Sequence, residues 1–367
     1  MYDAIIVGAR CAGSPLAMLL ARKGYRVLML DKSTFPSDIM STHYVQVAAV
    51  NQMQRWGVLD DVVASGAPPI EKITFHLNGA PFTPPADPAL DVQVAYCPRR
   101  TILDKILVDH ATASGAELRE GTVVDGLLRD GDAVSGIRAH AKGGVAFEER
   151  ARIVVGADGL HSTVAREVQA AEYNQRPAYT CGYYAYFSGV DLVDAEGYLG
   201  NDVGVLAFPT HHGLTCVGVG RPHEEFHNYR QDIEGNFMKF AEMASPEFAE
   251  RLRGGRREEP FIGTADTRNF FRKPYGPGWA LVGDAGYHKD FITGLGIMDA
   301  FRDAELLADA IDDGFAGRAP LEDALAGYET TRNETALPMY EFTCMLATFP
   351  DPRALFEQAA QAGAAPS

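Results

Sequence analysis

The first 31 residues contain the pattern that most restricts how this chain can fold. The short apolar run Tyr2–Val7 is typical of a buried parallel strand, and it ends at a glycine-rich turn over residues 8–13. Three leucines then lie on one side of a predicted helix. A second apolar run, residues 26–30, ends in Asp31. A strand, turn, helix and strand within about 30 residues form the βαβ unit that binds nucleotides at its helix N-terminus.

The turn departs from the usual dinucleotide-binding fingerprint at one position. Its first glycine, Gly8, permits a tight turn, and its last, Gly13, lets the helix pack on the strand. Arg10 stands where a second glycine would bring bare backbone to a pyrophosphate, so we predict that its cation lies along the phosphates. Asp31 follows Gly8 by 23 residues, where an acid binds a ribose hydroxyl. The alternative is an ordinary turn between a strand and a helix.

Two later motifs bring aspartates to the ends of predicted strands. One contains Gly156-Ala157-Asp158-Gly159; the other ends in Gly283-Asp284, after which Gly294-Leu295-Gly296 opens a helix. An aspartate there can bind a ribityl hydroxyl, and the positive helix end can stabilise charge on the pyrimidine edge of a reduced flavin. Either motif alone is consistent with a plain turn. The three motifs in this order favour a flavin nucleotide.

Composition excludes several classes of function. The 367 residues include 33 lysines and arginines against 49 aspartates and glutamates, a net charge of −16. This charge argues against nucleic acids and anionic membranes as partners, because both require a basic surface. The apolar runs are far shorter than the roughly 20 residues of a membrane helix. The five cysteines are scattered and form no Cys-x-x-Cys pair, which argues against disulfides and a metal site. No signal peptide precedes the first strand, so we expect a cytoplasmic protein.

Together, the three motifs resemble those of the FAD-dependent monooxygenases with the para-hydroxybenzoate hydroxylase fold, and of the related geranylgeranyl-reductase-like flavoproteins. The resemblance covers roughly residues 1–330. It implies an α/β protein with a Rossmann-like FAD-binding domain, an inserted antiparallel β-sheet domain for the substrate, and C-terminal helices. The implied boundaries are 1–70, 96–172 and 261–330 for the FAD-binding domain, 71–95 and 173–260 for the substrate-binding domain, and 331–367 for a C-terminal helical segment and tail.

The resemblance also implies which residues hold FAD. It places Asp31 at the adenosine ribose, Arg100 on the flavin side, Asp284 at the ribityl chain and the backbone of Gly296 at the pyrimidine edge. Asp158 belongs to a motif tied to both FAD and nicotinamide in hydroxylases. The full set of expected cofactor-binding residues is Gly8, Ala9, Arg10, Cys11, Ala12, Gly13, Ser14, Asp31, Lys32, Arg100, Val124, Asp158, Gly283, Asp284, Gly296 and Ile297.

One departure from the family pattern lies beside the expected flavin. The stretch His288-Lys289-Asp290-Phe291 stands where the family usually places a proline. We expect the bulky Phe291 to narrow or reshape the space above the isoalloxazine. Flavin-dependent halogenases share the fold but carry a paired-tryptophan motif, and this chain has only Trp56 and Trp279, which disfavours halogenation.

Aromatic residues predict an apolar substrate pocket. Side chains alternate along a strand, so Tyr184 and Tyr186 share one face of the predicted strand 180–187. With Phe208 and Phe291 they are expected to line a cavity for an apolar or aromatic small molecule. For each residue singly, a place in the hydrophobic core is the alternative.

Two histidines, His43 and His288, are candidates for proton handling, although a structural role is the commoner one for a single histidine. Catalytic residues are otherwise unassigned, because no nucleophile–base triad is visible. A flavin carries the chemistry itself, so none is required.

Periodicity predicts the other elements. Residues 122–128, 133–139 and 145–149 read as a meander of short strands, separate from a buried strand at 152–155. One helical stretch near 237–252 interrupts the strands of the substrate domain. The other predicted elements are strands 203–209, 214–220 and 279–282, helices 101–114, 297–311 and 321–333, and a frayed tail from 361 to 367.

These expectations favour one function and leave two alternatives. The favoured function is an FAD-dependent monooxygenase that hydroxylates or epoxidises an aromatic or polyketide-like small molecule. The resemblance implies that NAD(P)H reduces the flavin and that a flavin hydroperoxide transfers oxygen. No second glycine fingerprint for nicotinamide is present, so either NAD(P)H binds across the surface or a partner flavin reductase supplies the electrons. The alternatives are a double-bond reductase of the geranylgeranyl-reductase type and a non-catalytic FAD-binding protein.

Overall fold

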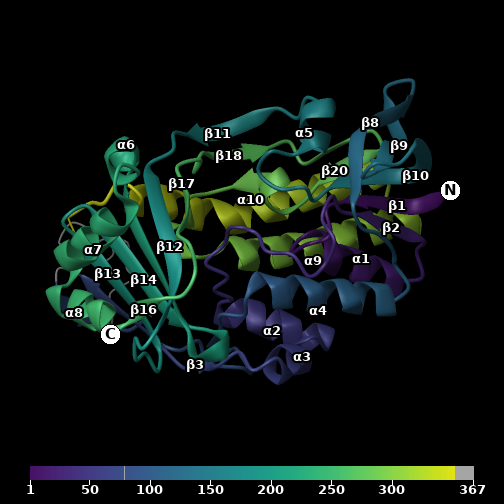
Figure 1. Cartoon of the computed structure of the whole chain (residues 1–367). Coiled ribbons are helices and arrows are strands. Elements are labelled where there is room, and N and C mark those ends of the chain that lie inside the picture. The colour runs from purple at the N-terminus through teal and green to yellow at the C-terminus, as the bar shows by residue number, and fades with distance from the viewer. Residues whose placement is uncertain (78, 352–367) are drawn as a thin grey trace.

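Two eight-stranded sheets and the helices that connect them make up the fold (Figure 1). The computed structural model describes residues 1–77 and 79–351. The first sheet comprises β1 (Tyr2–Val7), β2 (Val27–Leu30), β7 (Glu117–Arg119), β8 (Thr122–Asp130), β9 (Ala133–Ala141), β10 (Ala146–Gly156), β19 (Tyr275–Gly276) and β20 (Trp279–Leu281). The second comprises β4 (Ile73–Leu77), β5 (Ala80–Phe82), β12 (Thr180–Ser188), β13 (Ala195–Gly200), β14 (Val203–Pro209), β15 (Thr215–Pro222), β16 (Arg256–Arg257) and β17 (Ile262–Thr264).

Helices and two smaller sheets complete the fold of the described residues. The helices are α1 (Gly13–Arg22), α2 (Val47–Trp56), α3 (Leu59–Ala64), α4 (Arg100–Ala113), α5 (Thr163–Glu167), α6 (Phe226–Tyr229), α7 (Ile233–Ala244), α8 (Pro246–Gly254), α9 (Gly296–Phe315) and α10 (Leu321–Leu346). The small sheets are β3 (Pro69–Ile70) with β6 (Ala95–Tyr96), and β11 (Glu172–Arg176) with β18 (Asn269–Arg272) and β21 (Tyr287–His288).

The first sheet is the Rossmann-like core. Strands β20, β10, β1, β2 and β7 run parallel in that order. Parallel strands need apolar side chains on both faces. In β1, Ala4 and Ile6 pack with α1, α4 and α9 on one face, whereas Ile5 and Val7 pack under the β8–β9 meander on the other. The expected fold class is therefore confirmed.

Strand β10 corrects the sequence-based prediction, which divided residues 145–155 into two strands. The structure has one strand, in which residues 146–150 pair antiparallel with β9 and residues 151–156 pair parallel with β1. Residues 146–150 alternate between exposed and half-buried, whereas residues 151–156 are buried except for the exposed Arg152. This change of pattern at Ala151 looked like a boundary between strands.

The second sheet is antiparallel except where β4 pairs parallel with β13. Its outer face packs on α7 and α8, where the sequence predicted a single helical stretch over 237–252. Ser245 separates the two helices because its backbone is extended, with φ −158° and ψ 110°. Its hydroxyl then accepts a hydrogen bond from the Phe248 amide and caps α8.

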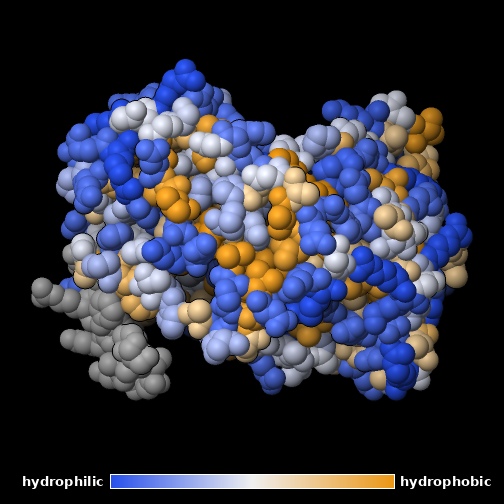
Figure 2. Space-filling view, turned by 90° about the horizontal axis from the view of Figure 1, so that it is seen from below, coloured by the Kyte–Doolittle hydropathy of each residue, from blue (hydrophilic) through white to orange (hydrophobic). Residues whose placement is uncertain are grey.

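Helices α9 and α10 lie across the middle of the molecule, between the sheets (Figure 1). Helix α10 is longer than predicted: it continues beyond residue 333 to Leu346 and includes Pro338. The predicted frayed tail, 361–367, lies outside the described residues. Seen from below, hydrophobic residues gather in the middle of the face and both ends are mostly hydrophilic (Figure 2). Within residues 1–77 and 79–351, no helix is both long and apolar enough to cross a membrane.

Candidate functional site

The three glycine motifs, far apart in the sequence, touch one another in the structure. Gly8 has φ +101°, and a Cβ on it would lie 2.4 Å from the Ala157 carbonyl oxygen of the second motif. A Cβ on Gly283 of the third motif would lie 2.8 Å from the Ala12 methyl group of the first. Only glycine permits contacts this close. The three motifs therefore lie together in the structure; that they form one FAD site stays a prediction.

Asp31 locks the first turn in place. Its Oδ2 accepts a hydrogen bond from the Ala9 amide at 2.9 Å, and its Oδ1 accepts one from the Ser33 amide at 2.8 Å. A carboxylate has about four acceptor positions, so two remain for a ribose hydroxyl. Two other residues expected at FAD lie apart from these contacts: Lys32 is exposed, and Val124, in β8, belongs to a buried hydrophobic cluster.

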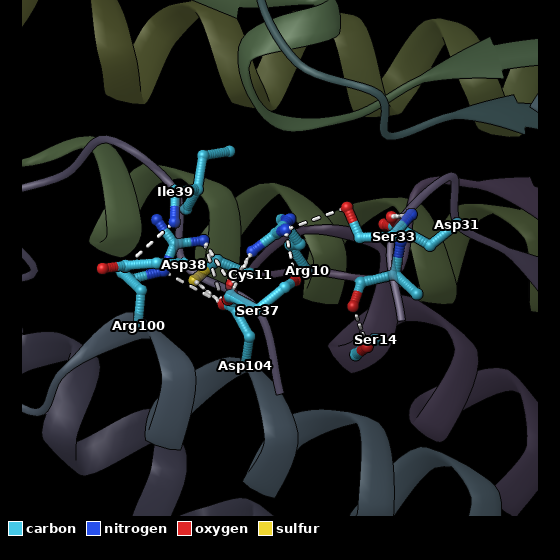
Figure 3. Close-up of polar contacts among 11 residues, drawn as sticks. Arg10, Cys11, Ser14, Asp31, Ser33, Ser37, Asp38, Ile39, Arg100 and Asp104 are labelled. Carbon is cyan, nitrogen blue, oxygen red and sulfur yellow. Dashed lines mark hydrogen bonds and ion pairs between the residues drawn. The ribbon is translucent and has the colours of Figure 1, made fainter. Parts of the chain in front are cut away.

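Arg10 points toward helix α4 and the loop after β2 (Figure 3). Its guanidinium forms an ion pair of 2.6 Å with Asp104 and donates a hydrogen bond of 2.8 Å to the Ser37 hydroxyl. Arg100 donates to the same carboxylate through Nε and Nη2, at 3.0 Å and 2.9 Å. The Cys11 thiol is a further donor to it, and burial raises the pKa of this thiol to about 12. The Asp104 carboxylate therefore holds the guanidinium groups of Arg10 and Arg100 beside the turn. Phosphate binding by Arg10 stays a prediction.

Asp104 is the residue that sequence reasoning left out of the site. It is completely buried and joins α4 to the first turn. A signal was present, because Arg100 and Asp104 are four residues apart, the spacing at which helical side chains meet. Nothing in the sequence pattern indicated that Arg10 would join this pair.

Asp158 stabilises its own loop. Its carboxylate accepts hydrogen bonds from the Ser162 hydroxyl at 2.5 Å and from the Thr163 amide at 2.7 Å, at the start of α5. Burial raises its pKa, and these hydrogen bonds oppose that shift. The sequence-based role of Asp158 toward FAD or nicotinamide stays a prediction.

The third motif leaves groups free for a ligand. Asp284 is exposed, and no hydrogen bond or ion pair joins its side chain to another of the residues described. Helix α9 begins at Gly296 without a side-chain cap, and a Cβ on Gly296 would have open space within 4 Å. Helix α1 also begins without one. The residues present fit an FAD. The uncapped amides at the start of α1 and α9 can bind its polar groups, the Asp284 carboxylate is free, and there is open space beside Gly296 and the buried Ile297.

His43 lies in a buried polar cluster beside strand β12 of the second sheet. Its Nε2 is hydrogen-bonded to the Tyr186 hydroxyl at 2.8 Å, and its Nδ1 is 3.1 Å from the Cys97 sulfur. Burial, together with the nearby Arg99 cation, lowers the pKa of His43 to about 3. The imidazole is therefore neutral at pH 7. Proton handling by His43 stays a prediction, and it would start from this neutral form.

The low pKa of His43 makes the free energy of unfolding depend on pH. The variant His43→Asn tests this dependence. Below pH 6.5 the unfolded chain gains a proton that the folded protein does not take up until about pH 3, so the free energy of unfolding falls as pH drops. At pH 5 the loss due to His43 is about 2 kcal/mol. We expect His43→Asn to remove this loss, and asparagine suits the left-handed backbone there, φ 46°. Urea unfolding at pH 7 and pH 5 measures it.

The matched control is His212→Asn, because His212 is exposed and has φ 63°. It should lose as much stability between pH 7 and pH 5 as the native protein. Equal losses in all three proteins would mean that His43 is protonated readily in the folded state.

His288 lies away from this cluster. It is in β21, its Nδ1–H donates to the Arg268 carbonyl oxygen, and its ring stacks on Phe270. The two candidate histidines are therefore in different parts of the fold. A role for His288 in proton handling stays a prediction.

The four aromatic residues expected at the substrate occupy different environments. The hydroxyl oxygen of Tyr184 accepts a hydrogen bond from the Ser41 amide at 3.1 Å, and Tyr186 lies beneath the Arg99 guanidinium, 3.8 Å from ring centre to Cζ. Phe208 is buried and stacks on Tyr44. Phe291 is half-buried in the 3₁₀ turn η4 (Phe291–Thr293).

The described residues contain no group of three or more histidine, cysteine or acidic side chains suited to a metal ion. All five cysteines are buried with free thiols.

Sequence comparisons identify relatives. A family model described as an FAD binding domain matches residues 1–213. The digeranylgeranylglycerophospholipid reductase of Methanosarcina acetivorans is 29% identical over 353 residues, which cover 91% of this chain and 81% of that protein. Digeranylgeranylglycerophospholipid reductase 2 of Methanococcoides burtonii is 28% identical, with coverage of 85% and 76%.

Solved structures share the fold. The myxobacterial chondrochloren halogenase CndH superposes with a TM-score of 0.86 at 23% identity, covering 93% of this chain and 81% of that one. PqsL of Pseudomonas aeruginosa, described as a probable FAD-dependent monooxygenase, has a TM-score of 0.82 at 22% identity and covers 98% and 99%. The family match spans more than half of this chain and includes the first two of the three converging motifs. The chain therefore belongs to the FAD binding domain family and is a flavoprotein with the fold of FAD-dependent oxidoreductases.

Proposed function

We propose that this protein is a cytoplasmic FAD-dependent monooxygenase that adds one oxygen atom of O₂ to an apolar aromatic or polyketide-like small molecule. The observation that carries the proposal is the contact between the inner face of the second sheet, which bears Tyr184 and Tyr186, and the loop after β2. Bound FAD supplies the redox chemistry there.

Two hydrogen bonds make this contact. The Ser41 amide donates to the Tyr184 hydroxyl, and His43 binds the Tyr186 hydroxyl, so the loop is fastened to strand β12 at two points. Both tyrosines are at least nine-tenths buried. Exclusion of water protects a reactive oxygen species from wasteful breakdown, which is what a monooxygenase requires of its protein.

The residues of the chain orient the reactants. Tyr184 uses its oxygen as an acceptor, and its hydroxyl proton has no acceptor among the residues described, so it can donate to an oxygen atom of the substrate. Burial raises the pKa of Tyr184 to about 12, which keeps that proton in place at neutral pH. Asp284 and the uncapped start of α9 hold the flavin end of the cofactor.

The source of electrons is part of the proposal. We propose NAD(P)H as the reductant, either bound directly across the surface or used by a partner flavin reductase. Mixing the FAD-loaded protein with NADPH or NADH under nitrogen separates the two routes, since direct use bleaches the flavin without a partner.

The second candidate is a double-bond reductase. The reductases of Methanosarcina acetivorans and Methanococcoides burtonii align with most of this chain, at 29% and 28% identity. The ring of Phe291 argues against a long isoprenoid, because it occupies the inner face of the sheet along which such a chain would extend. A non-catalytic FAD-binding protein is the remaining alternative.

Stopped-flow mixing of the reduced, FAD-loaded protein distinguishes the three. We expect oxygenated buffer to reoxidise the flavin rapidly when 1-naphthol is present, with one oxygen atom gained by the product, and farnesol under nitrogen to leave the flavin reduced. Oxidation of the flavin by farnesol under nitrogen, with two hydrogens gained by the alkene, would identify a reductase and overturn the proposal. Slow oxidation in air that no probe accelerates, without product, would indicate a non-catalytic protein.

A further inference from the structure

Three glycines lie side by side on the inner face of the second sheet. Gly182 of β12 is opposite Gly220 of β15, and Gly220 is opposite Gly204 of β14. The neighbouring row on the same face contains Tyr184, Gly218 and Leu206. Because glycine has no side chain, the sheet surface is lowest along the first row.

The ring of Phe291 fills part of this low row. A Cβ on Gly182 would lie 3.1 Å from the Phe291 Cζ, and a Cβ on Gly220 would lie 3.7 Å from its Cε2. A Cβ on the third glycine, Gly204, would lie 3.5 Å from Phe349 and 3.9 Å from both Ile292 and Leu199. The phenyl ring therefore rests on bare backbone, in a position that a larger residue at Gly182 would disturb.

The turn that carries this ring is fixed to the sheet. Asp290 accepts a hydrogen bond of 2.7 Å from the Thr180 hydroxyl, and its amide donates to the Asn269 side chain at 2.7 Å. Its other carboxylate oxygen caps the turn at the Ile292 amide. Asp290 is buried. Phe291 follows directly, so the ring is held as a fixed wall and not as a mobile lid.

We propose that Phe291 sets the length of the ligand that this face accepts. The native protein takes a compact apolar molecule with an oxygen atom for Tyr184, and the phenyl ring blocks extension along the glycine row. Phe291→Ala opens the row to an unbranched apolar chain. This inference rests on the proposed function, which places the substrate on this face.

Ligand length can be tested without turnover. Butanol, hexanol, octanol and decanol are titrated into the FAD-loaded protein, and binding is followed by the change in flavin absorbance. Each buried CH₂ contributes about fourfold in affinity. We expect this gain in affinity to stop at a short alcohol in the native protein and to continue to longer alcohols in Phe291→Ala. In Phe291→Leu it should stop at an intermediate length. The leucine variant keeps an apolar side chain and so serves if the alanine variant folds poorly.

Two further variants make the test specific. Phe226→Ala removes an equally half-buried ring that stacks on Tyr183 at the outer face, and should leave the length limit unchanged. Adding Gly220→Ala to Phe291→Ala should restore part of the limit, because the new methyl group fits the row at ordinary contact distances.

The same length limit in the native protein, Phe291→Ala and Phe291→Leu would overturn the inference, as would a shift in Phe226→Ala of equal size. Failure of the proposed function has a different signature. A protein that transfers no oxygen but shows the shift retains the role of Phe291, whereas one that transfers oxygen without the shift does not.

Discussion

Asp104→Ala should lower the free energy of unfolding by about 3–5 kcal/mol, the loss typical of a buried ion pair that loses one partner. Asp104 is completely buried and accepts hydrogen bonds from Arg10, Arg100 and Cys11. In the variant, which lacks the Asp104 carboxylate, the buried Arg100 cation has no acid in contact to neutralise it. Arg10 suffers less, because its side chain is 16% exposed and the Ser37 hydroxyl remains as a partner.

Urea unfolding of the apoprotein measures this loss without a contribution from bound FAD. Asp109→Ala is the matched control, because Asp109 is an exposed acid on the same helix that pairs with Lys105 four residues away. It should cost less than about 0.5 kcal/mol. Similar small losses in both variants would show that the two arginines find other partners and that Asp104 is not the centre of the cluster.

The sequence predicted the nucleotide-binding half best because local pattern determines it. Strand β1 was predicted at Tyr2–Val7, its bounds in the structure, since a run buried on both faces and ended by a glycine has few other solutions. The sequence grouped the motifs of Gly8, Ala157 and Gly283 as favouring one flavin nucleotide, and in the structure they converge. Parallel strands end at the same edge of a sheet, so motifs at those ends meet.

Contacts between distant side chains were not predictable in the same way. Arg10 and Asp104 are 94 residues apart and meet only because α1 packs against α4. His43 is a single residue in a loop. Its low pKa arises from burial beneath β12 and from the nearby cations of Arg99 and Arg100. The length of α10 was underestimated because polar residues and Pro338 interrupt the apolar pattern that indicates a helix.

Asp284→Ala should weaken FAD binding by about tenfold to somewhat over a hundredfold. This range corresponds to about 1.5–3 kcal/mol, the usual contribution of a hydrogen bond to a charged group. In the described part of the chain, the carboxylate has no hydrogen-bond or ion-pair partner, although it lies near enough to Arg100 to raise the pKa of that guanidinium. Its removal therefore costs the fold little, and a loss of affinity reports on the cofactor.

The measurement is a fluorescence titration of apoprotein with FAD, accompanied by urea unfolding of the same samples. Asp132→Ala, in the exposed turn between β8 and β9, is the control for removing an acid of the same kind and should bind FAD as the native protein does. A well-folded Asp284→Ala protein with native affinity would show that the third motif is only a turn. Weaker binding with unchanged unfolding would instead show that Asp284, the exposed acid where the third motif meets the first, contributes to FAD binding, as its predicted place at the ribityl chain requires.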